Sequence, residues 1–449
     1  MLILLKKMRK REQLLSVVCV LFVLGRCWLE LQLPGYMKEL AVLVQTPGNP
    51  SVMTWKMGRK MLECVLGSFL LAVPSGWCAA QAAAGFAYAL RETVFGKVME
   101  LSKPEVDAFS VHRLLDCTTE DIRKLQQMLN EGLLVLVHAV GICLLTVLRI
   151  IGRNGLAGEW VELGGYAFLV FLALGEAAAT LQWYPAVRLS AGRILDVLDA
   201  QTSVLPGEKT QGREVGTLEF QRVSFAYPGE KHSVVQDISF RVELGQTVAI
   251  VGASDSGKSA LAELAARLYD PAEGRIWVDG LELREYAFET LYNKISYVSK
   301  RAALFSGSVR SNVFFGESEI INREEDLKAV LMQIPGEILP ERVDESGETL
   351  SDGQRQRLGI ARALARRPEI LILNDCFEGL DIPTCKGLLE GLDQTTVLLI
   401  IQQTGLARMA DHIVVLEQGK LVGQGTHEQL VKACPGYRAL LTDGQEAEP

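Results

Sequence analysis

The segment from Gly252 to Ser259 holds the residues whose types and spacing most clearly suggest chemistry. It reads Gly-Ala-Ser-Asp-Ser-Gly-Lys-Ser. Glycines at this spacing let backbone N–H groups point at phosphate oxygens, and a helix that follows presents its positive N-terminus to the same anion. Lys258 can reach the β- and γ-phosphates of a nucleotide, and Ser259 can ligate Mg²⁺. The predicted phosphate cradle consists of Gly252, Ser254, Gly257, Lys258, Ser259 and Ala260.

The elements around this loop fit that role. The apolar run 247–251 predicts a buried parallel strand, and the pattern 260–269 predicts a helix. A second run, 370–373, ends in Asn374-Asp375, and a third, 396–401, ends in Gln402-Gln403. Polar residues at the carboxyl ends of parallel strands face the ligand crevice, so Asn374 is a candidate metal ligand and Asp375 a candidate water-activating carboxylate. Upstream, 217–225 alternates like an edge strand.

Composition separates the chain into two parts. The 449 residues carry a net charge of −8, which argues against a nucleic-acid binder that relies on phosphate contacts. Residues 1–200 hold 20 basic and 17 acidic residues, whereas residues 201–449 hold 26 and 37. Nine cysteines in 449 residues are too sparse for a disulfide scaffold, and their spacing does not suggest a metal site. We expect an apolar membrane part followed by an acidic soluble part.

Four apolar stretches precede residue 200, at 14–25, 64–90, 132–148 and 163–187. The second has no charged residue over 27 positions, which is enough to cross a hydrocarbon core of about 30 Å. We therefore expect about four spans. Glu176 interrupts the last stretch, and burial in the bundle interior is favoured over a role in a substrate path. His138, in the third stretch, is expected to be a packed residue rather than a ligand.

Basic residues set the expected orientation. Five of them precede the first span, which predicts a cytoplasmic N-terminus. A signal peptide over 1–35 is the less favoured alternative, because no small-residue cleavage pattern follows Gly25. Segment 91–130 is then cytoplasmic, and its apolar spacing predicts two helices around a turn near Lys103-Pro104.

Further motifs identify a family resemblance. Residues 350–357 read LSDGQRQR, 225–229 read FAYPG and 304–313 read LFSGSVRSNV. Together with the phosphate loop and the run ILILND at 370–375, the order of these motifs along the chain resembles that of the nucleotide-binding domain of ATP-binding cassette (ABC) transporters of the exporter branch. The resemblance implies two paired chains, with each ATP held between one phosphate loop and the other chain's signature segment. It also implies roles for Tyr227 in stacking on adenine and for Ser351, Gly353 and Gln354 in that signature segment.

Several positions depart from the family pattern. Lys300 stands where the family has a glutamine that senses Mg²⁺ and the attacking water, and Asn374-Asp375 stands where it has Asp-Glu. Gln403 replaces the switch histidine, and Asp352 replaces a signature glycine. Asparagine holds Mg²⁺ less firmly than a carboxylate, and a shorter aspartate can misplace the general base. We predict that ATP binds with Mg²⁺, while Asp375, Gln403 and Lys300 support slow hydrolysis or none.

The expected fold is an α-helical membrane domain of about four spans followed by an α/β P-loop NTPase domain of the ABC type. The expected boundaries are 1–200 for the membrane domain, with a cytoplasmic extension at 91–130, then a linker at 201–215, the nucleotide-binding domain at 216–442 and a tail at 443–449.

Exporters of this family have six spans per half, so the resemblance implies that a middle piece is missing between residues 149 and 163. The expected function is that of an exporter subunit in the plasma (inner) membrane. Its ATP-binding domain is cytoplasmic, and its partners are the lipid bilayer and a second half-transporter, a heterodimer being favoured over a homodimer. A regulatory ABC protein that moves no substrate is the alternative, and a soluble ATPase acting on nucleic acid is disfavoured.

Overall fold

The chain forms two compact units, Met1–Leu101 with Glu105–Gln201, and Ser102–Pro104 with Thr202–Pro449. The computed structural model describes residues 2–45, 51–151, 160–230, 232–315, 330–332, 334, 339–340, 342–344, 349–377, 380–392, 394–402 and 404–445.

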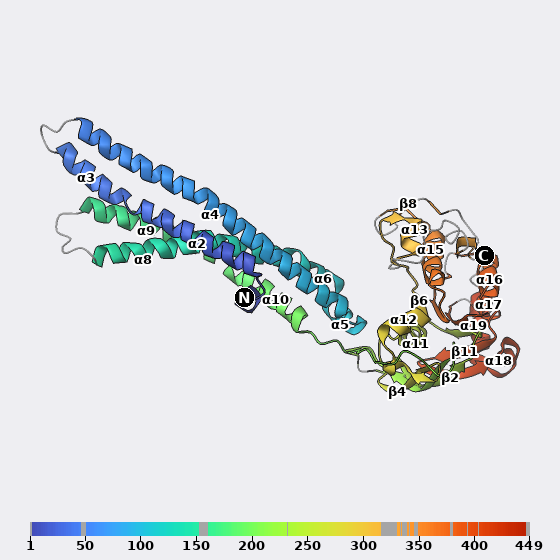
Figure 1. The fold of residues 1–449 in the computed structure, drawn as a ribbon. Helices are drawn as coiled ribbons and strands as arrows, with labels where there is room; N and C mark the ends of the chain where they lie inside the picture. The colour runs from blue at the N-terminus through green and yellow to red at the C-terminus, as the bar shows by residue number, and fades with distance from the viewer. Residues whose placement is uncertain are drawn as a thin grey trace. The chain divides into compact units, whose positions relative to one another are not determined.

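The first unit is a bundle of long helices that run beside one another (Figure 1). Helix α2 packs along α4 and α8, and α8 packs along α9. The helices are α1 Leu2–Leu5, α2 Lys10–Glu30, α3 Leu33–Gln45, α4 Ser51–Glu100, α5 Lys103–Phe109, α6 Val111–Thr118, α7 Glu120–Glu131, the π-helical turn η1 Gly132–Leu136, α8 Val137–Ile151, α9 Trp160–Leu181 and α10 Tyr184–Asp199.

The number of membrane-competent segments agrees with the sequence. Within the described part of the chain, four helical segments are long and apolar enough to cross a membrane. They are Lys10–Leu43, Met53–Glu100, Val111–Ile151 and Trp160–Asp199. Each contains one of the four apolar stretches, so the prediction of about four spans is confirmed.

The segment 91–130 is more divided than the sequence predicts. A turn does separate α4 from α5 just before Lys103, but α5, α6 and α7 then follow in place of a single second helix. Ser110 has a φ of +65°, which no α-helix accommodates. The hydroxyl of Thr119 donates to the carbonyl oxygen of Leu115 at 2.8 Å, and such local bonds compete with helical ones. The prediction of two helices is therefore wrong.

A polar cluster lies inside the helical bundle. The carboxylate of Glu30 accepts hydrogen bonds from Arg26 Nε at 2.7 Å and from Ser68 Oγ at 3.1 Å. Its second oxygen lies 2.8 Å from Nε2 of His138, whose side chain is buried. His138 is thus a packed residue with a polar partner. Glu176, by contrast, is exposed in the single chain, so the expectation that it lies in the bundle interior is wrong.

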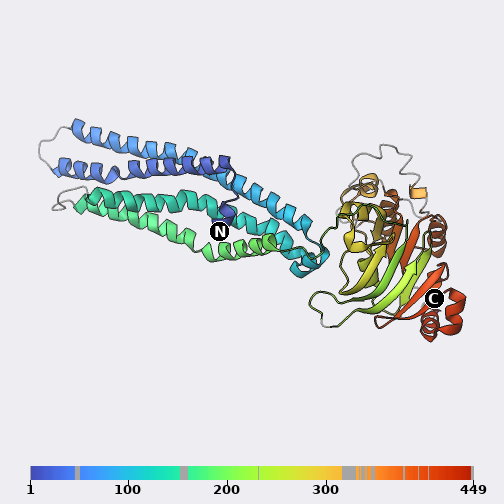
Figure 2. The same ribbon diagram turned by 60° about the horizontal axis from the view of Figure 1, so that its bottom comes forward.

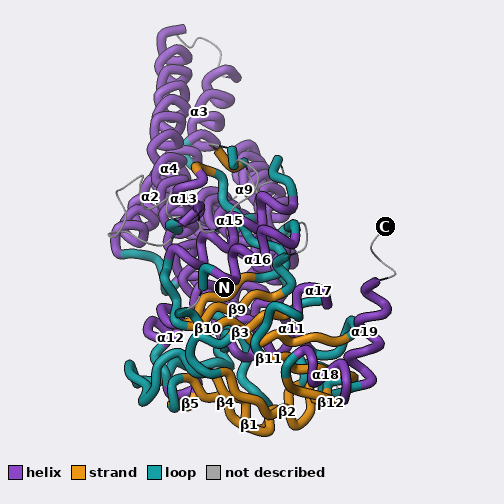
Figure 3. The backbone as a smooth tube through the Cα atoms, turned by 90° about the vertical axis from the view of Figure 1, so that its right-hand side faces the viewer, coloured by secondary structure: helices purple, strands orange, loops and turns teal. Residues whose placement is uncertain are grey.

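The second unit is built on a six-stranded sheet in the order β12-β11-β3-β10-β9-β6. Figure 3 shows the strands of this unit in orange. Within the six-stranded sheet, all neighbouring pairs are parallel except β11 with β12. Alternate residues of the buried strands enter two different cores, with Ile370 and Ile372 on one face and Leu371 and Leu373 on the other. The strands are β3 Thr247–Gly252, β6 Ile295–Val298, β9 Ile370–Asn374, β10 Thr396–Ile400, β11 His412–Glu417 and β12 Lys420–Gly425.

A second, antiparallel sheet has the order β2-β1-β4-β5. Strand β1 therefore has neighbours on both sides, and the prediction of an edge strand is wrong. Its alternation reflects one buried face rather than an open edge. The strands are β1 Leu218–Phe225, β2 Val235–Val242, β4 Glu273–Val278 and β5 Leu281–Glu282, and a short pair is formed by β7 Gly307–Ser308 and β8 Arg342–Val343.

Helices cover the strands of this unit (Figure 2). Helix α11 contacts β3, β9 and β10, and α15 contacts β6. The helices are α11 Lys258–Ala265, the 3-10 turn η2 Leu283–Glu285, α12 Phe288–Lys294, α13 Val309–Val313, α15 Asp352–Ala365, α16 Ile382–Glu390, α17 Thr404–Ala407, α18 His427–Ala433 and α19 Pro435–Gln445.

Candidate nucleotide-binding site

The predicted phosphate loop lies between a strand and a helix, as expected. Strand β3 ends at Gly252, and α11 begins at Lys258. A Cβ atom at Gly252 would lie 2.4 Å from the carbonyl oxygen of Leu416. Gly257 has a φ of +94°, and a Cβ there would lie 2.8 Å from the carbonyl oxygen of Val234. Both positions therefore require glycine for steric reasons.

Lys258 is folded back over the loop. Its Nζ donates to the carbonyl oxygens of Gly252 and Ala253, at 2.7 Å each. Burial lowers the pKa of this ammonium, while the carboxylates of Asp375 and Asp255 act in the opposite direction. The loop therefore holds a partly desolvated cation whose bonds to neutral carbonyls can be exchanged for stronger bonds to phosphate oxygens.

A pocket of about 710 Å³ opens at this loop, large enough for a nucleotide. Gln402, Gln418 and His232 also line it, although the sequence analysis did not assign them to the site. The predicted site residues that line it are Tyr227, Ser254, Gly257, Lys258, Ser259, Ala260 and Asp375.

Tyr227 forms one wall of the pocket. Its hydroxyl donates to Oε2 of Glu263 at 2.9 Å, and its ring meets those of Phe225 and Tyr269 edge-on. Burial raises the pKa of the Tyr227 phenol, so the hydroxyl stays protonated at neutral pH. The ring is thus held in one orientation beside the loop, as a surface on which a planar base can stack.

The candidate metal ligands lie together but are both neutral. The Ser259 hydroxyl donates to Oδ1 of Asn374 at 3.4 Å, and Asn374 Nδ2 donates to the hydroxyl of Tyr297 at 3.0 Å. Among the described residues, no group of three or more His, Cys, Asp or Glu side chains could hold a metal ion. Mg²⁺ sites in proteins usually include one or two carboxylates. This donor set therefore does not fit a firmly held Mg²⁺ ion.

The carboxylate of Asp375, which follows Asn374 in the chain, forms an ion pair. Its Oδ2 lies 3.4 Å from the Nζ of Lys300. The backbone of Asp375 has a φ of +52°, and its N–H donates to the carbonyl oxygen of Ile400 at 2.9 Å. The structure thus brings together two predicted catalytic residues, Lys300 and Asp375, which lie 75 positions apart in the chain.

The signature residues do not line this pocket. Ser351 caps α15: its Oγ accepts from the backbone N–H of Gln354 at 3.1 Å, and its own N–H donates to Gln354 Oε1 at 3.1 Å. Gly353 lies in the first turn of the same helix. If each site is shared between two chains, the signature residues are expected to lie away from the phosphate loop of their own chain. Gln403, the predicted switch position, lies outside the described residues.

Comparison with known proteins identifies the second unit. Residues 235–378 match the family model of the ABC transporter. The second unit therefore belongs to the ABC transporter family. Its apolar helices and ATP-binding domain share one polypeptide, which is the architecture of a fused half-transporter.

Curated relatives of this chain include proteins of several bacteria. An uncharacterized ABC transporter ATP-binding protein of Mycobacterium tuberculosis is 36% identical over 307 residues, which are 65% of this chain and 52% of the relative. An ATP-dependent lipid A-core flippase of Pseudomonas fluorescens is 35% identical over 357 residues, 75% of this chain and 58% of the relative. The chain spans about half the length of the curated relatives it matches.

The fold of the chain also matches a solved structure. A bacterial Atm1-family ABC exporter with ATP bound aligns with a TM-score of 0.74 over 97% of this chain and 99% of that chain. At 19% identity, this likeness concerns the fold.

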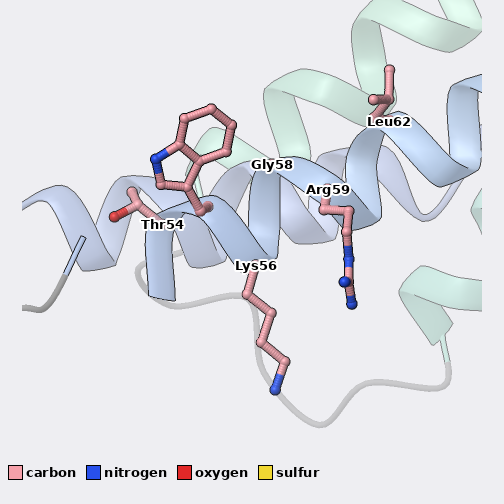
Figure 4. Close-up of a pocket in the computed structure, with 6 residues that line it drawn as sticks. Thr54, Lys56, Gly58, Arg59 and Leu62 are labelled. Atoms are coloured by element: carbon pink, nitrogen blue, oxygen red, sulfur yellow. The ribbon is translucent and has the colours of Figure 1, made fainter. Parts of the chain in front are cut away.

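A second, larger pocket lies in the first unit of the chain. It measures about 940 Å³ and is lined by Thr54, Trp55, Lys56, Gly58, Arg59 and Leu62, all near the N-terminal end of α4. Figure 4 shows the side chains of Lys56 and Arg59 extending to the same side of the helix. The described residues that line it include no phosphate loop and no carboxylate, so they do not match the predicted nucleotide chemistry.

Proposed function

We propose that this chain is the ATP-binding subunit of an ABC exporter, in which ATP binding drives a change in the membrane helices while its own site hydrolyses ATP slowly or not at all. One observation carries the proposal: the phosphate loop is complete, but the residues that should break the phosphate bond are altered. Lys258 and the glycines are in place, whereas Asp375 is paired with Lys300 and Asn374 is neutral. Binding depends mainly on the first group, and turnover depends on the second.

The cofactor in this proposal is ATP. Mg²⁺ would be held mainly by the phosphate oxygens, with Ser259 and Asn374 as the chain's own ligands, because these two donors lie 3.4 Å apart at the loop. Tyr227 would stack on adenine. Ser351, Gly353 and Gln354 would contact the nucleotide of a partner chain.

The proposed partner is a second half-transporter with competent catalytic groups, which makes a heterodimer the first choice and a homodimer the second. The four membrane-competent helices support an integral membrane protein. We place it in the plasma (inner) membrane with the ATP-binding domain in the cytoplasm. The proposed division remains 1–200, 201–215, 216–442 and 443–449.

Retention of labelled ATP by the purified full chain tests the binding step. We expect Lys258→Ala to weaken retention at least about tenfold, because it removes a charge-assisted contact to phosphate. Lys386→Ala is the matched control, since Lys386 is an exposed residue that pairs with Glu390 on α16. Equal retention by the two variants would contradict the proposal.

Phosphate release in a single turnover tests the chemical step. We expect release from the bound nucleotide to be far slower than the 1–100 s⁻¹ typical of phosphoryl-transfer enzymes such as kinases. Ordinary release rates from a homogeneous sample would show that the altered residues still support hydrolysis.

A further inference from the structure

The Lys300–Asp375 ion pair is fixed by the sheet. Strands β6 and β9 are parallel neighbours, with Val298 opposite Leu373. Lys300 and Asp375 each follow the last of these paired residues by two positions, so both leave the same edge of the sheet. The pair therefore results from strand register and not from a chance meeting of two flexible side chains.

The backbone of Lys300 is held from the opposite side. The carbonyl oxygen of Lys300 accepts a hydrogen bond from Nε2 of Gln356, a buried side chain on α15. The Lys300 side chain is about half exposed, at 51%, while that of Asp375 is 17% exposed. An anchored backbone and a partly solvated ammonium leave Nζ able to turn between the carboxylate and a ligand in the pocket.

The groups beside Asn374 favour a ligand that brings no metal. The protein offers two ammonium groups, Lys258 and Lys300, which both interact with Asp375. The usual metal position instead holds a hydroxyl and an amide, from Ser259 and Asn374, bonded to each other. A cation beside Asn374 could gain the carboxylate of Asp375 only by displacing Lys300 from it; the other carboxylates among the described lining residues are Glu230 and Asp255.

We propose that Lys300 is a built-in counter-ion for the phosphates, so that this site binds nucleoside triphosphate free of divalent metal nearly as well as the Mg²⁺ complex. The proposal rests on the nucleotide binding argued above and adds which form of the nucleotide the site accepts. Lys300 supplies positive charge at the edge of the sheet where a metal-binding carboxylate would otherwise recruit Mg²⁺. Loss of this charge makes binding depend on the metal.

The test is equilibrium binding of labelled ATP to the full chain at fixed ionic strength, with Mg²⁺ or with EDTA. For the wild-type chain we expect the two affinities to agree within about threefold, or about 0.7 kcal/mol. Lys300→Gln should bind about tenfold more weakly in EDTA than in Mg²⁺. Lys300→Arg, which keeps the charge, should behave like the wild type, and Lys386→Gln controls for the loss of an exposed lysine elsewhere.

Two results would overturn the proposal. One is a wild-type chain that retains ATP only with Mg²⁺, which leaves nucleotide binding intact but removes the role of Lys300. The other is a Lys300→Gln variant that matches the wild type in EDTA. If no variant retains ATP under either condition, while thermal melting shows all of them folded, the proposed function fails as well.

Discussion

Replacing Gly257 by alanine would place a methyl group where the phosphate loop has no room. The φ of Gly257 is +94°, and an added Cβ would lie 2.6 Å from Val235 Cγ1 and 2.8 Å from the carbonyl oxygen of Val234. Gly229 has a similar φ of +87°, but nothing lies within 4 Å of its Cβ position. A comparison of Gly257→Ala with Gly229→Ala therefore separates the cost of the backbone conformation, which both variants share, from the cost of the close contacts, which only Gly257→Ala makes.

The expected magnitudes follow from these two differences. A residue with a Cβ in the left-handed region costs about 1–2 kcal/mol. Overpacking against a close neighbour adds about 1–3 kcal/mol, and the carbonyl of Val234 belongs to the backbone and cannot rotate away. We expect Gly229→Ala to lower the free energy of unfolding by about 1–2 kcal/mol and Gly257→Ala to lower it by about 2–5 kcal/mol.

Urea unfolding of the full chain in detergent provides the assay. Trp277 is the only tryptophan among residues 202–449, so the ¹⁹F resonance of fluorotryptophan at this position reports on the second unit. Equal losses for the two variants would refute the argument from the Val234 and Val235 contacts. No loss in either variant would refute the argument from backbone conformation.

Two further predictions concern the same unit. Tyr227→Ala should weaken ATP binding by about 1–3 kcal/mol through lost stacking, whereas Tyr227→Phe should bind within about twofold of the wild type; equal losses would assign the effect to the bond with Glu263 instead. Burial raises the pKa of Cys385 to about 11, so at pH 8 its thiolate is about 100-fold scarcer than that of a free cysteine. Mass spectrometry should therefore find it alkylated slowly in the folded chain and rapidly in urea, and similar rates in both states would contradict its burial.

Much of the second unit could be predicted from the sequence because its main strands are short, continuous apolar runs. Each such run is buried on both faces, and its polar end marks the ligand edge, as Asn374 and Asp375 do. The ion pair between Lys300 and Asp375 could not be predicted in this way. It depends on β6 lying next to β9, and the pairing of strands so far apart in the chain is set by the packing of the whole sheet.

In the first unit, the sequence does not predict which side of each apolar helix is buried. A stretch that is apolar on all sides has no face that can be recognised from its sequence, so Glu176 could not be placed. Among the described residues of this unit, the buried acidic side chains are Glu12, Asp121 and Glu162; Glu162 accepts a hydrogen bond from the hydroxyl of Tyr166 at 2.9 Å. Their partners lie on other helices or one turn away, and only the assembled bundle reveals them.

The cluster around Glu30 limits how the first unit can rearrange. It joins α2, α4 and α8 through Glu30, Ser68 and His138. Pulling these helices apart would leave a carboxylate and an imidazole among hydrocarbon side chains, at a cost of several kcal/mol. We therefore expect these three helices to move as one rigid body. Any rearrangement of the first unit should occur at contacts between helices that have no such polar cluster.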